Sequence, residues 1–356
     1  MYPRHRIDIR PGDLAFAAVA CARPWRRERL ERAIEELVAP PDDALACLSV
    51  RSAFDLLLGA LDLPAGSEVL VSAITHPDMV GILELHGLTP VPVDLDLETL
   101  APSPELAEEL VSERTRMLLV APLFGCGVDL APLAAVASRH GLLLVEDLAQ
   151  DLREPGLAGS PHADVSLFSF GPIKTATALG GAVARVRDDG LRARMRAALA
   201  AWPLQPRREL LARTARFALL AALARPAAYG AFVRACRRRG RDLDELLSSF
   251  VRGFRVPYHD PAFAARIRRR PSAPLLALLR RRLATFDRER LARRAALGER
   301  LASALPQELF HPGRRAPVRT HWVFPVVAGD PGRLLAEVRR QGLDAAPARA
   351  TSAIVA

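Results

Sequence analysis

The sequence has 356 residues, 50% of them hydrophobic, and a formal net charge of +10 at pH 7. A chain of this length is expected to form about two domains with a sizeable buried core. The basic charge does not by itself indicate a nucleic-acid partner, because the sequence contains neither zinc-finger spacing nor an RNA-binding signature of interleaved basic and aromatic residues. We take it as an arginine-rich surface that favours anionic ligands.

The cysteines and the first residues exclude several other classes of protein. The four cysteines are scattered without a Cys-x-x-Cys pair, so they indicate neither a zinc site nor a disulfide framework. The first twelve residues are charged and lack the apolar segment of a signal peptide. No apolar run reaches the roughly 18 residues that a membrane span needs. We therefore expect a soluble protein of the reducing cytoplasm without a metal site.

Lysine is almost absent from the chain. Among the 50 lysine and arginine residues, Lys174 is the single lysine. Arginine can replace lysine as a surface charge, but its guanidinium group stays protonated and cannot form an imine with an aldehyde. Codon bias could leave one lysine anywhere, so the surroundings of Lys174 decide whether its amine has a chemical role.

Helical and strand patterns alternate in the first half of the chain, which is typical of an α/β domain. Helices are expected at Arg27–Val38, Ser52–Leu61, Ser103–Leu110 and Leu130–His140, with Asp129 as the candidate N-cap of the last. Several of the expected strands are apolar throughout, which indicates a mostly parallel sheet with helices on both faces. The strands are expected at Glu68–Val71, Val91–Val93, Met117–Val120, Leu142–Val145, Val165–Phe168 and Ala182–Val186.

We assign residues 1–200 to this large domain and interpret residues 201–256 as an arginine-rich helical insertion. Within the insertion, helices are expected at Phe217–Leu223 and Tyr229–Arg239, separated by Pro226. Such helices are typical of a solvated cap packed on the core, with contact to an anionic membrane surface as the alternative.

Residues 257–356 predict a smaller α+β domain that ends early. We expect one long helix at Ala273–Leu305, a strand at Trp322–Val327 and a helix at Leu334–Gln341. The final run Ser352–Ala356 is apolar and strand-like.

The surroundings of Lys174 favour a chemical role. The lysine follows one strand in the segment Phe168-Ser169-Phe170-Gly171-Pro172-Ile173-Lys174, and an earlier strand ends in Glu146-Asp147. If these strands are parallel, an amine and a carboxylate meet at the ligand-binding edge of the sheet. A pyridoxal ring needs such a carboxylate, which keeps its nitrogen protonated so that the ring can accept electrons.

A phosphate site is indicated where Ser49-Val50-Arg51-Ser52 opens a helix. Free N–H groups and a hydroxyl at a helix N-terminus favour phosphate, and Arg51 would add charged hydrogen bonds. Taken singly, each residue has a simpler explanation: Asp147 as a turn residue, Ser49 as an ordinary N-cap, His76 as a loop histidine. Their joint order along the chain favours a site.

The order of several motifs carries a family resemblance. They are Glu68-Val69-Leu70-Val71, Pro90-Val91-Pro92-Val93-Asp94, Leu123-Phe124-Gly125, Val145-Glu146-Asp147-Leu148-Ala149-Gln150, Phe168-Ser169-Phe170 ahead of Lys174, and Gly180-Gly181-Ala182. With them, the chain from about Cys47 to Val186 resembles the DegT/DnrJ/StrS-type sugar aminotransferases. These are fold-type-I pyridoxal-phosphate enzymes best known for aminating nucleotide-linked keto-sugars.

The resemblance implies a role for each candidate residue. It assigns the Schiff base with pyridoxal phosphate to Lys174, the pyridinium nitrogen to Asp147, the neighbourhood of the ring hydroxyl to Gln150, the phosphate to Ser169 and ring stacking to His76. It also implies a homodimer with active sites at the subunit interface.

The chain departs from the family pattern at two places. The family's Ser-Gly-Thr phosphate segment is Ser49-Val50-Arg51 here, and Arg51 is expected to compensate. The family's Asn-Tyr-Arg segment, which reaches the partner subunit's phosphate, is replaced near Arg268-Arg269-Arg270.

The expected function is the transfer of an amino group from an amino acid, with glutamate as the expected donor, to a nucleotide-linked keto-sugar. One alternative keeps the cofactor but changes the chemistry, as in a dehydratase or an enzyme with a non-sugar acceptor. Another is a cofactor-binding regulator or scaffold without turnover, which the altered phosphate segment and the arginine-rich insertion motivate. The presence of both Lys174 and Asp147 argues against this last alternative.

Overall fold

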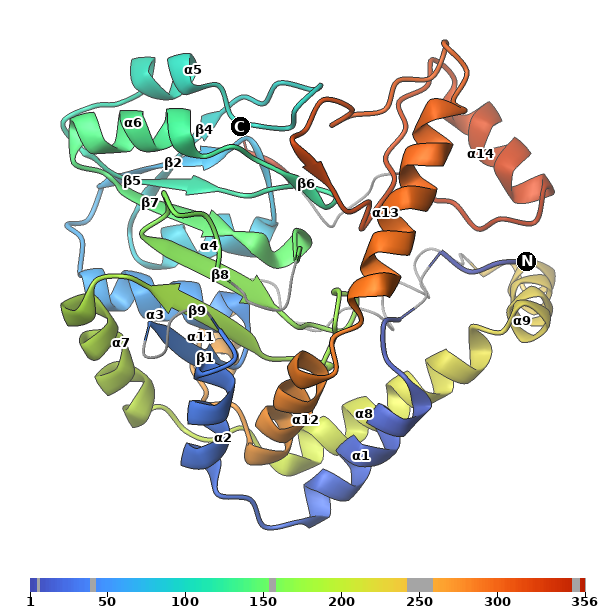
Figure 1. Cartoon of the computed structure of the whole chain (residues 1–356), viewed down its shortest axis with the longest axis horizontal. Helices are drawn as coiled ribbons and strands as arrows, with labels where there is room; N and C mark the ends of the chain where they lie inside the picture. The colour runs from blue at the N-terminus through green and yellow to red at the C-terminus, as the bar shows by residue number, and fades with distance from the viewer. Residues whose placement is uncertain (5–6, 39–42, 154–157, 242–258, 348–352, 356) are drawn as a thin grey trace.

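A seven-stranded sheet forms the centre of the computed structural model, which describes residues 1–4, 7–38, 43–153, 158–241, 259–347 and 353–355 (Figure 1). The strand order is β1-β9-β8-β7-β5-β2-β4. Within this sheet β9 alone runs antiparallel to its neighbours. The strands are β1 (Ala44–Cys47), β2 (Glu68–Ser72), β4 (Thr89–Val93), β5 (Thr115–Val120), β7 (Leu143–Asp147), β8 (Val165–Ser169) and β9 (Ala182–Val186).

The six strands that the sequence predicted are confirmed, and β1 was missed. Its sequence, Ala-Leu-Ala-Cys, has little of the β-branched and aromatic character by which strands are recognised. All four residues of β1 are buried, and their side chains alternate between the two faces of the sheet: Leu45 and Cys47 pack on one face, Ala44 and Ala46 on the other. Covering helices hold this short strand in place.

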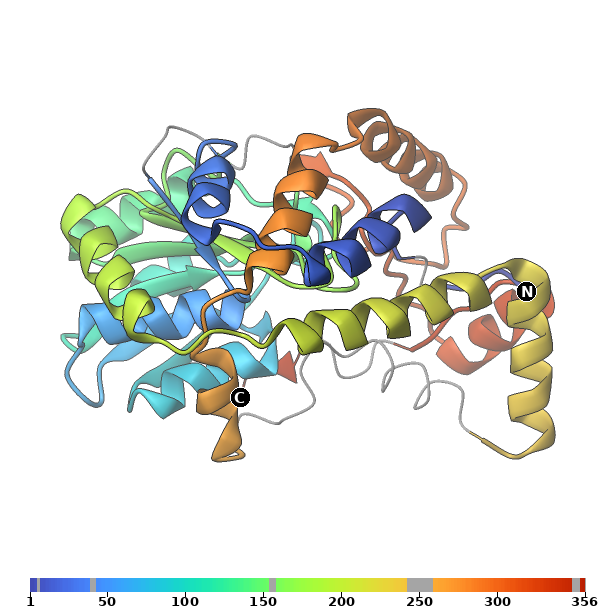
Figure 2. The same cartoon turned by 90° about the horizontal axis from the view of Figure 1, so that it is seen from below.

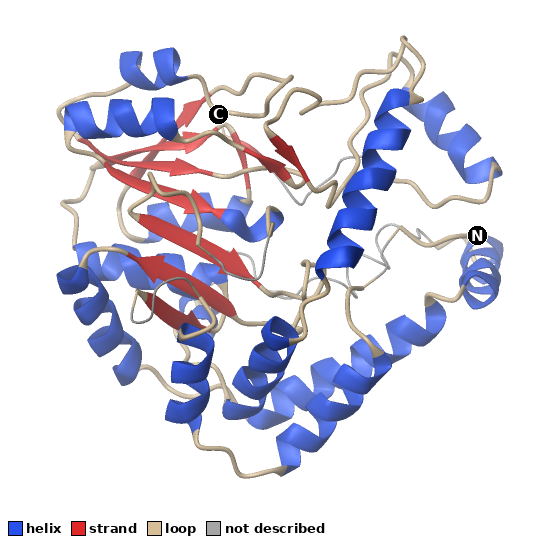
Figure 3. Cartoon of the chain, viewed as in Figure 1, coloured by secondary structure: helices blue, strands red, loops and turns tan. Residues whose placement is uncertain are grey.

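Helices cover both faces of the sheet, as predicted (Figure 3). One face packs against α3 (Val50–Leu61), α4 (Pro77–Leu85), α7 (Asp189–Ala201) and α11 (Ala262–Ile267). The other face packs against α2 (Arg27–Glu35) and α12 (Ala273–Ala284) beside β1. Towards β4, that same face packs against α5 (Pro104–Glu109) and α6 (Ala131–His140). The N-cap of α6 is Leu130 rather than the predicted Asp129, whose Oδ1 still accepts a hydrogen bond from the Ala131 N–H at 3.0 Å.

The arginine-rich stretch forms two helices that meet at Pro226, as predicted. Helix α8 (Arg207–Leu223) begins earlier than expected and packs against α1 (Pro11–Ala22) and α12. Helix α9 (Pro226–Arg238) follows it at a sharp angle (Figure 2). In the described ranges, no helix combines the length and apolarity that crossing a membrane would require. The end of the predicted insertion, from 242 to 256, lies outside the described residues.

The prediction of one long helix at Ala273–Leu305 is wrong. The chain forms α12 and a separate helix α13 (Arg288–Ser303), with three residues between them. The helix is interrupted at Asp287, which starts a new helix as the N-cap of α13: its side chain accepts a hydrogen bond from the Arg290 N–H at 2.9 Å. Phe286 packs against the core beneath α12, which fixes the bend.

The prediction of a strand at Trp322–Val327 is also wrong. This segment is a loop whose single strand-like contact is a bridge from Val327 to Phe310. Pro325 cannot donate a ladder hydrogen bond, and His321, with φ of 47°, turns the chain just before the segment. The expected helix near the C-terminus is confirmed as α14 (Pro331–Arg340).

Short strands join the C-terminal part of the chain to the large sheet's loops. Strand β10 (Val318–Arg319) pairs with β6 (Cys126–Gly127), and β11 (Ala353–Ile354) pairs with β3 (Ile74–Thr75). The C-terminal segments therefore reach the carboxyl edge of the parallel strands, where the candidate site lies.

Candidate active site

A cavity of about 2370 Å³ lies at the carboxyl ends of the parallel strands. It brings together all but one of the residues that the sequence singled out. Ser52 is the exception: its side chain is buried and its Oγ lies 2.8 Å from the Oγ of Ser49. The residues that do line the cavity are Ser49, Arg51, His76, Asp147, Gln150, Ser169 and Lys174.

The Lys174 amine lies within this cavity rather than on the outer surface. Its Nζ is 4.3 Å from the centre of the Trp322 ring, a favourable contact for a cation over an aromatic face. Burial lowers the pKa of Lys174 to about 8; the nearby Arg51 also lowers it, and Asp147 opposes the shift. Roughly a tenth of the amine is therefore uncharged at pH 7, far more than for an ordinary lysine.

This lowered pKa predicts an unusual pH profile for the amine. The rate at which an amine-reactive reagent labels Lys174 should rise about tenfold per pH unit below pH 8 and level off above it, because only the neutral amine reacts. Mass spectrometry of the Lys174 peptide measures the rate. A rate that keeps rising to pH 10 would show that the amine is not perturbed.

Asp147 ends β7 beside this amine and is 6% exposed. Burial raises the pKa of its carboxyl group, while the Ala149 N–H, which donates to Oδ1 at 2.9 Å, and the charges of Lys174 and Arg51 favour the ionised form. The preceding Glu146 makes different contacts, accepting from Ser166 Oγ and from the Ser160 N–H, both at 2.6 Å. Because successive side chains of a strand point in opposite directions, the side chain of Asp147 faces the cavity and that of Glu146 does not.

The predicted phosphate side is built around the start of α3. Ser49 is its N-cap and accepts a hydrogen bond from the Ser52 N–H at 3.1 Å. The Arg51 guanidinium contacts two other residues that line the cavity. Its Nε donates to Asp78, and its Nη2 lies 3.0 Å from Nε2 of His76. Arg51 and His76 therefore form one cluster with Asp78.

The other predicted residues hold loops as well as lining the cavity. Ser169 accepts a weak hydrogen bond from the Gly171 N–H at 3.4 Å, and Gln150 accepts one from the Phe124 N–H at 3.1 Å. Of the segment Arg268-Arg269-Arg270, only Arg269 lines the cavity. Arg268 instead donates two hydrogen bonds of 2.9 Å to Asp55 of α3.

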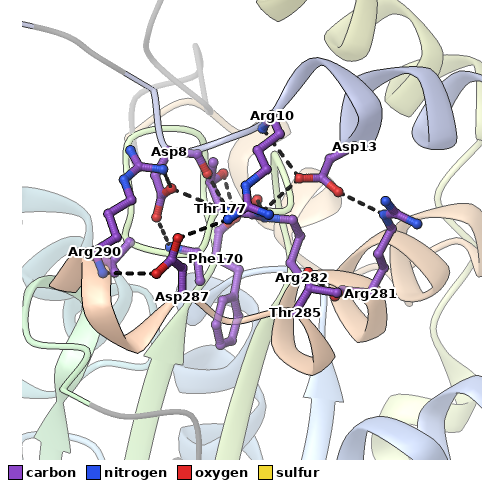
Figure 4. Close-up of polar contacts among 12 residues, drawn as sticks. Asp8, Arg10, Asp13, Phe170, Thr177, Arg281, Arg282, Thr285, Asp287 and Arg290 are labelled. Atoms are coloured by element: carbon purple, nitrogen blue, oxygen red, sulfur yellow. Dashed lines mark hydrogen bonds and ion pairs between the residues drawn. The ribbon is translucent and has the colours of Figure 1, made fainter.

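Sequence reasoning missed the contacts that hold the loop after Lys174 (Figure 4). Ala176 has φ of 54°, in the left-handed region, and its N–H donates to Asp8 at 2.8 Å. Arg282 of α12 donates to the Thr177 carbonyl at 3.0 Å and to the Asp8 carbonyl at 2.7 Å. Arg290 of α13 pairs with Asp8 as well. We call Asp8, Arg282 and Arg290 the loop clasp.

Trp322 was also missed, because its segment was taken for a strand. Its indole N–H donates to the Ile173 carbonyl at 3.0 Å, next to the lysine. The unusual density of aromatic and proline residues in His321-Trp322-Val323-Phe324-Pro325 was the available signal.

A protein-family model described as the DegT/DnrJ/EryC1/StrS aminotransferase family matches residues 25–204. GDP-perosamine synthase of Caulobacter vibrioides is 33% identical over 155 residues, which are 43% of this chain and 42% of that relative. The chain thus matches less than half the length of this curated relative.

Solved structures share the fold over nearly the whole chain. The structure of DesV from S. venezuelae matches with a TM-score of 0.63 and 24% identity, covering 93% of this chain and 78% of that one. PseC of Helicobacter pylori, described as an aminotransferase of pseudoaminic acid biosynthesis, matches with a TM-score of 0.68 and 16% identity, covering 96% and 83%. The chain therefore has the fold-type-I architecture that its sequence predicted.

Proposed function

Because the chain belongs to the DegT/DnrJ/EryC1/StrS aminotransferase family, we propose that it is a pyridoxal-phosphate-dependent aminotransferase. The observation that carries this proposal is the pair formed by Lys174 and Asp147. The sole lysine presents an amine with a pKa of about 8 in a large cavity, and a buried carboxylate influences it from the next strand of the sheet.

The residues fit pyridoxal phosphate. The cofactor, when bound, supplies an aldehyde for the lysine and a protonated ring that accepts electrons from a breaking C–H bond. The lowered pKa of Lys174 suits an amine that must be neutral to attack an aldehyde and later to take a proton at Nζ. Asp147, which is buried and lines the cavity, would hold the proton on the ring nitrogen.

Five further residues would position the cofactor. Ser49, at the start of α3, and Ser169, at the end of β8, offer hydroxyl groups to the phosphate, and His76 offers a ring at the cavity wall. Gln150 would lie near the ring hydroxyl. Arg51 supports the phosphate or an anionic substrate group from within its cluster with Asp78 and His76.

For substrates, we propose an amino acid donor, glutamate, and a keto-sugar acceptor linked to a nucleotide. The acceptor is supported by the cationic lining of the cavity, since arginine binds phosphate through its paired N–H groups, and by the match to GDP-perosamine synthase. The lining includes Arg213, Arg216, Arg266, Arg269, Arg290, Arg293 and Arg294. We also propose a homodimer, as the resemblance implies.

Glutamate alone tests the donor half of the proposal. Added to the protein loaded with pyridoxal phosphate, it should convert the cofactor to its amine form, with loss of the visible absorbance band. A nucleotide-linked keto-sugar should then restore the band, and the keto acid that corresponds to glutamate serves as the control for reversal. If the absorbance band of the loaded protein responded to no amino donor, the aminotransferase proposal would be wrong. The protein would then be a cofactor-binding regulator or scaffold.

A further inference from the structure

Arg213 comes from the arginine-rich stretch, which the family resemblance did not cover, yet it lines the cavity. Its Nη1 donates to the Leu179 carbonyl at 2.7 Å. The guanidinium lies directly on Gly180, because a Cβ atom at that glycine would be 2.7 Å from the same nitrogen. Helix α8 thus places a cation against the loop that follows Lys174.

Within the described parts of the chain, no carboxylate forms an ion pair or a hydrogen bond with this cation. Glu209, one turn earlier on α8, is paired instead with Arg269 at 2.8 Å. Burial lowers the pKa of the Arg213 guanidinium, and the nearby Arg216, which also lines the cavity, lowers it further, while the charge of Glu209 opposes the shift only in part. A cation that is mostly removed from water is unfavourable unless an anion compensates it.

The position of Gly180-Gly181 shows where that anion would sit. The Gly181 N–H donates to the Leu48 carbonyl at 2.9 Å, which places the pair beside Ser49 at the start of α3. The Gly181 carbonyl accepts from the Phe170 N–H at 3.0 Å, which places it beside Ser169. The glycine pair therefore connects the two hydroxyl groups proposed for the phosphate, and Arg213 lies against this pair from α8.

We infer that Arg213 binds a phosphate group in this cavity. The inference rests on the proposed function for the source of that group, which is the phosphate of pyridoxal phosphate or the diphosphate of a nucleotide-linked acceptor. In either case the arginine-rich helix is part of the ligand site, and it compensates for the glycine that the phosphate segment Ser49-Val50-Arg51 lacks.

Pyridoxal, which has no phosphate, separates binding of the phosphate from a structural role. The ratio of the Kd for pyridoxal to the Kd for pyridoxal phosphate measures what the phosphate contributes. If Arg213 binds the cofactor phosphate, Arg213→Gln should lower this ratio about 10- to 100-fold, the range for a hydrogen bond to a charged group. Arg213→Lys, which keeps the charge, should recover part of the loss.

Arg208→Gln is the matched control, because it removes the same charge from an exposed position on the same helix. It should leave the ratio unchanged. If Arg213→Gln weakened the binding of pyridoxal and of pyridoxal phosphate equally, Arg213 would serve to hold the loop at Leu179. That result would contradict its binding of the cofactor phosphate.

The second arm of the experiment uses a nucleoside diphosphate, which competes with the nucleotide-linked acceptor for the protein loaded with pyridoxal phosphate. If Arg213 binds the acceptor's diphosphate, Arg213→Gln should weaken this competitor about 10- to 100-fold and leave the pyridoxal ratio as in the unaltered protein. No change in either arm would overturn the inference. Failure of the unaltered protein to bind pyridoxal phosphate would instead count against the proposed function, so the two failures are distinguishable.

Discussion

Lys174→Arg is expected to abolish both the attachment of pyridoxal phosphate and all transfer of amino groups. The chain has no second lysine, and a guanidinium group that stays protonated cannot form the bond to the aldehyde. Borohydride treatment followed by peptide mass spectrometry should find the cofactor on the Lys174 peptide of the unaltered protein and on no peptide of the variant.

The variant keeps a positive charge in the cavity, so we expect it to fold. Loss of cofactor attachment and of activity would then not be due to unfolding. Its thermal unfolding should be compared with that of the unaltered protein. The one other amine of the chain is the N-terminus, and cofactor fixed elsewhere in the variant would remove Lys174 from its proposed role.

Asp147→Asn is expected to retain much of the cofactor but to lower kcat on the order of 100-fold or more, the scale of losing one preorganised polar group in an active site. An amide has the shape of the carboxylate but cannot keep the ring nitrogen protonated, so the ring becomes a poor electron acceptor. The measurement is the rate of the glutamate half reaction in a stopped-flow spectrometer.

Glu146→Gln is the control for this substitution. Glu146 is equally buried on the same strand but bonds to Ser166 and Ser160 away from the cavity. It should affect the free energy of unfolding more than the rate. A near-normal kcat in Asp147→Asn would show that the carboxylate does not serve the ring.

The sequence predicted the parts of the fold that depend on local pattern. Apolar strands and intervening helices are visible in one dimension, and the carboxyl-edge rule then brought Lys174 and Asp147 together. β1 escaped because alanines give no strand signal, and its pairing partner β9 is more than a hundred residues away. Its place depends on tertiary packing.

The parts of the site that were missed come from segments distant in sequence. No sequence motif marks Asp8 or Arg213 as a neighbour of the loop after Lys174, because each reaches that loop through the packing of segments outside the sheet. Trp322 lies in a segment dense in aromatic residues and proline, but only the fold brings its ring to Lys174. In a chain with so many arginines, one that binds a ligand looks the same in sequence as one that is solvated. In the structure, Arg213 stands out because its guanidinium lines the cavity against Gly180 and forms no ion pair with any described carboxylate.

The loop clasp also sets an order of events when the chain is synthesised. Asp8 leaves the ribosome first, but Arg282, which is 274 residues further on, emerges only after the whole sheet and the lysine loop have been made. Domains generally fold as units from the N-terminus during synthesis. The sheet can therefore assemble while Asp8 and the backbone around Ala176 still lack the guanidinium groups of Arg282 and Arg290 that hold them. A nascent chain stopped before α12 should contain the lysine without a fixed place for it.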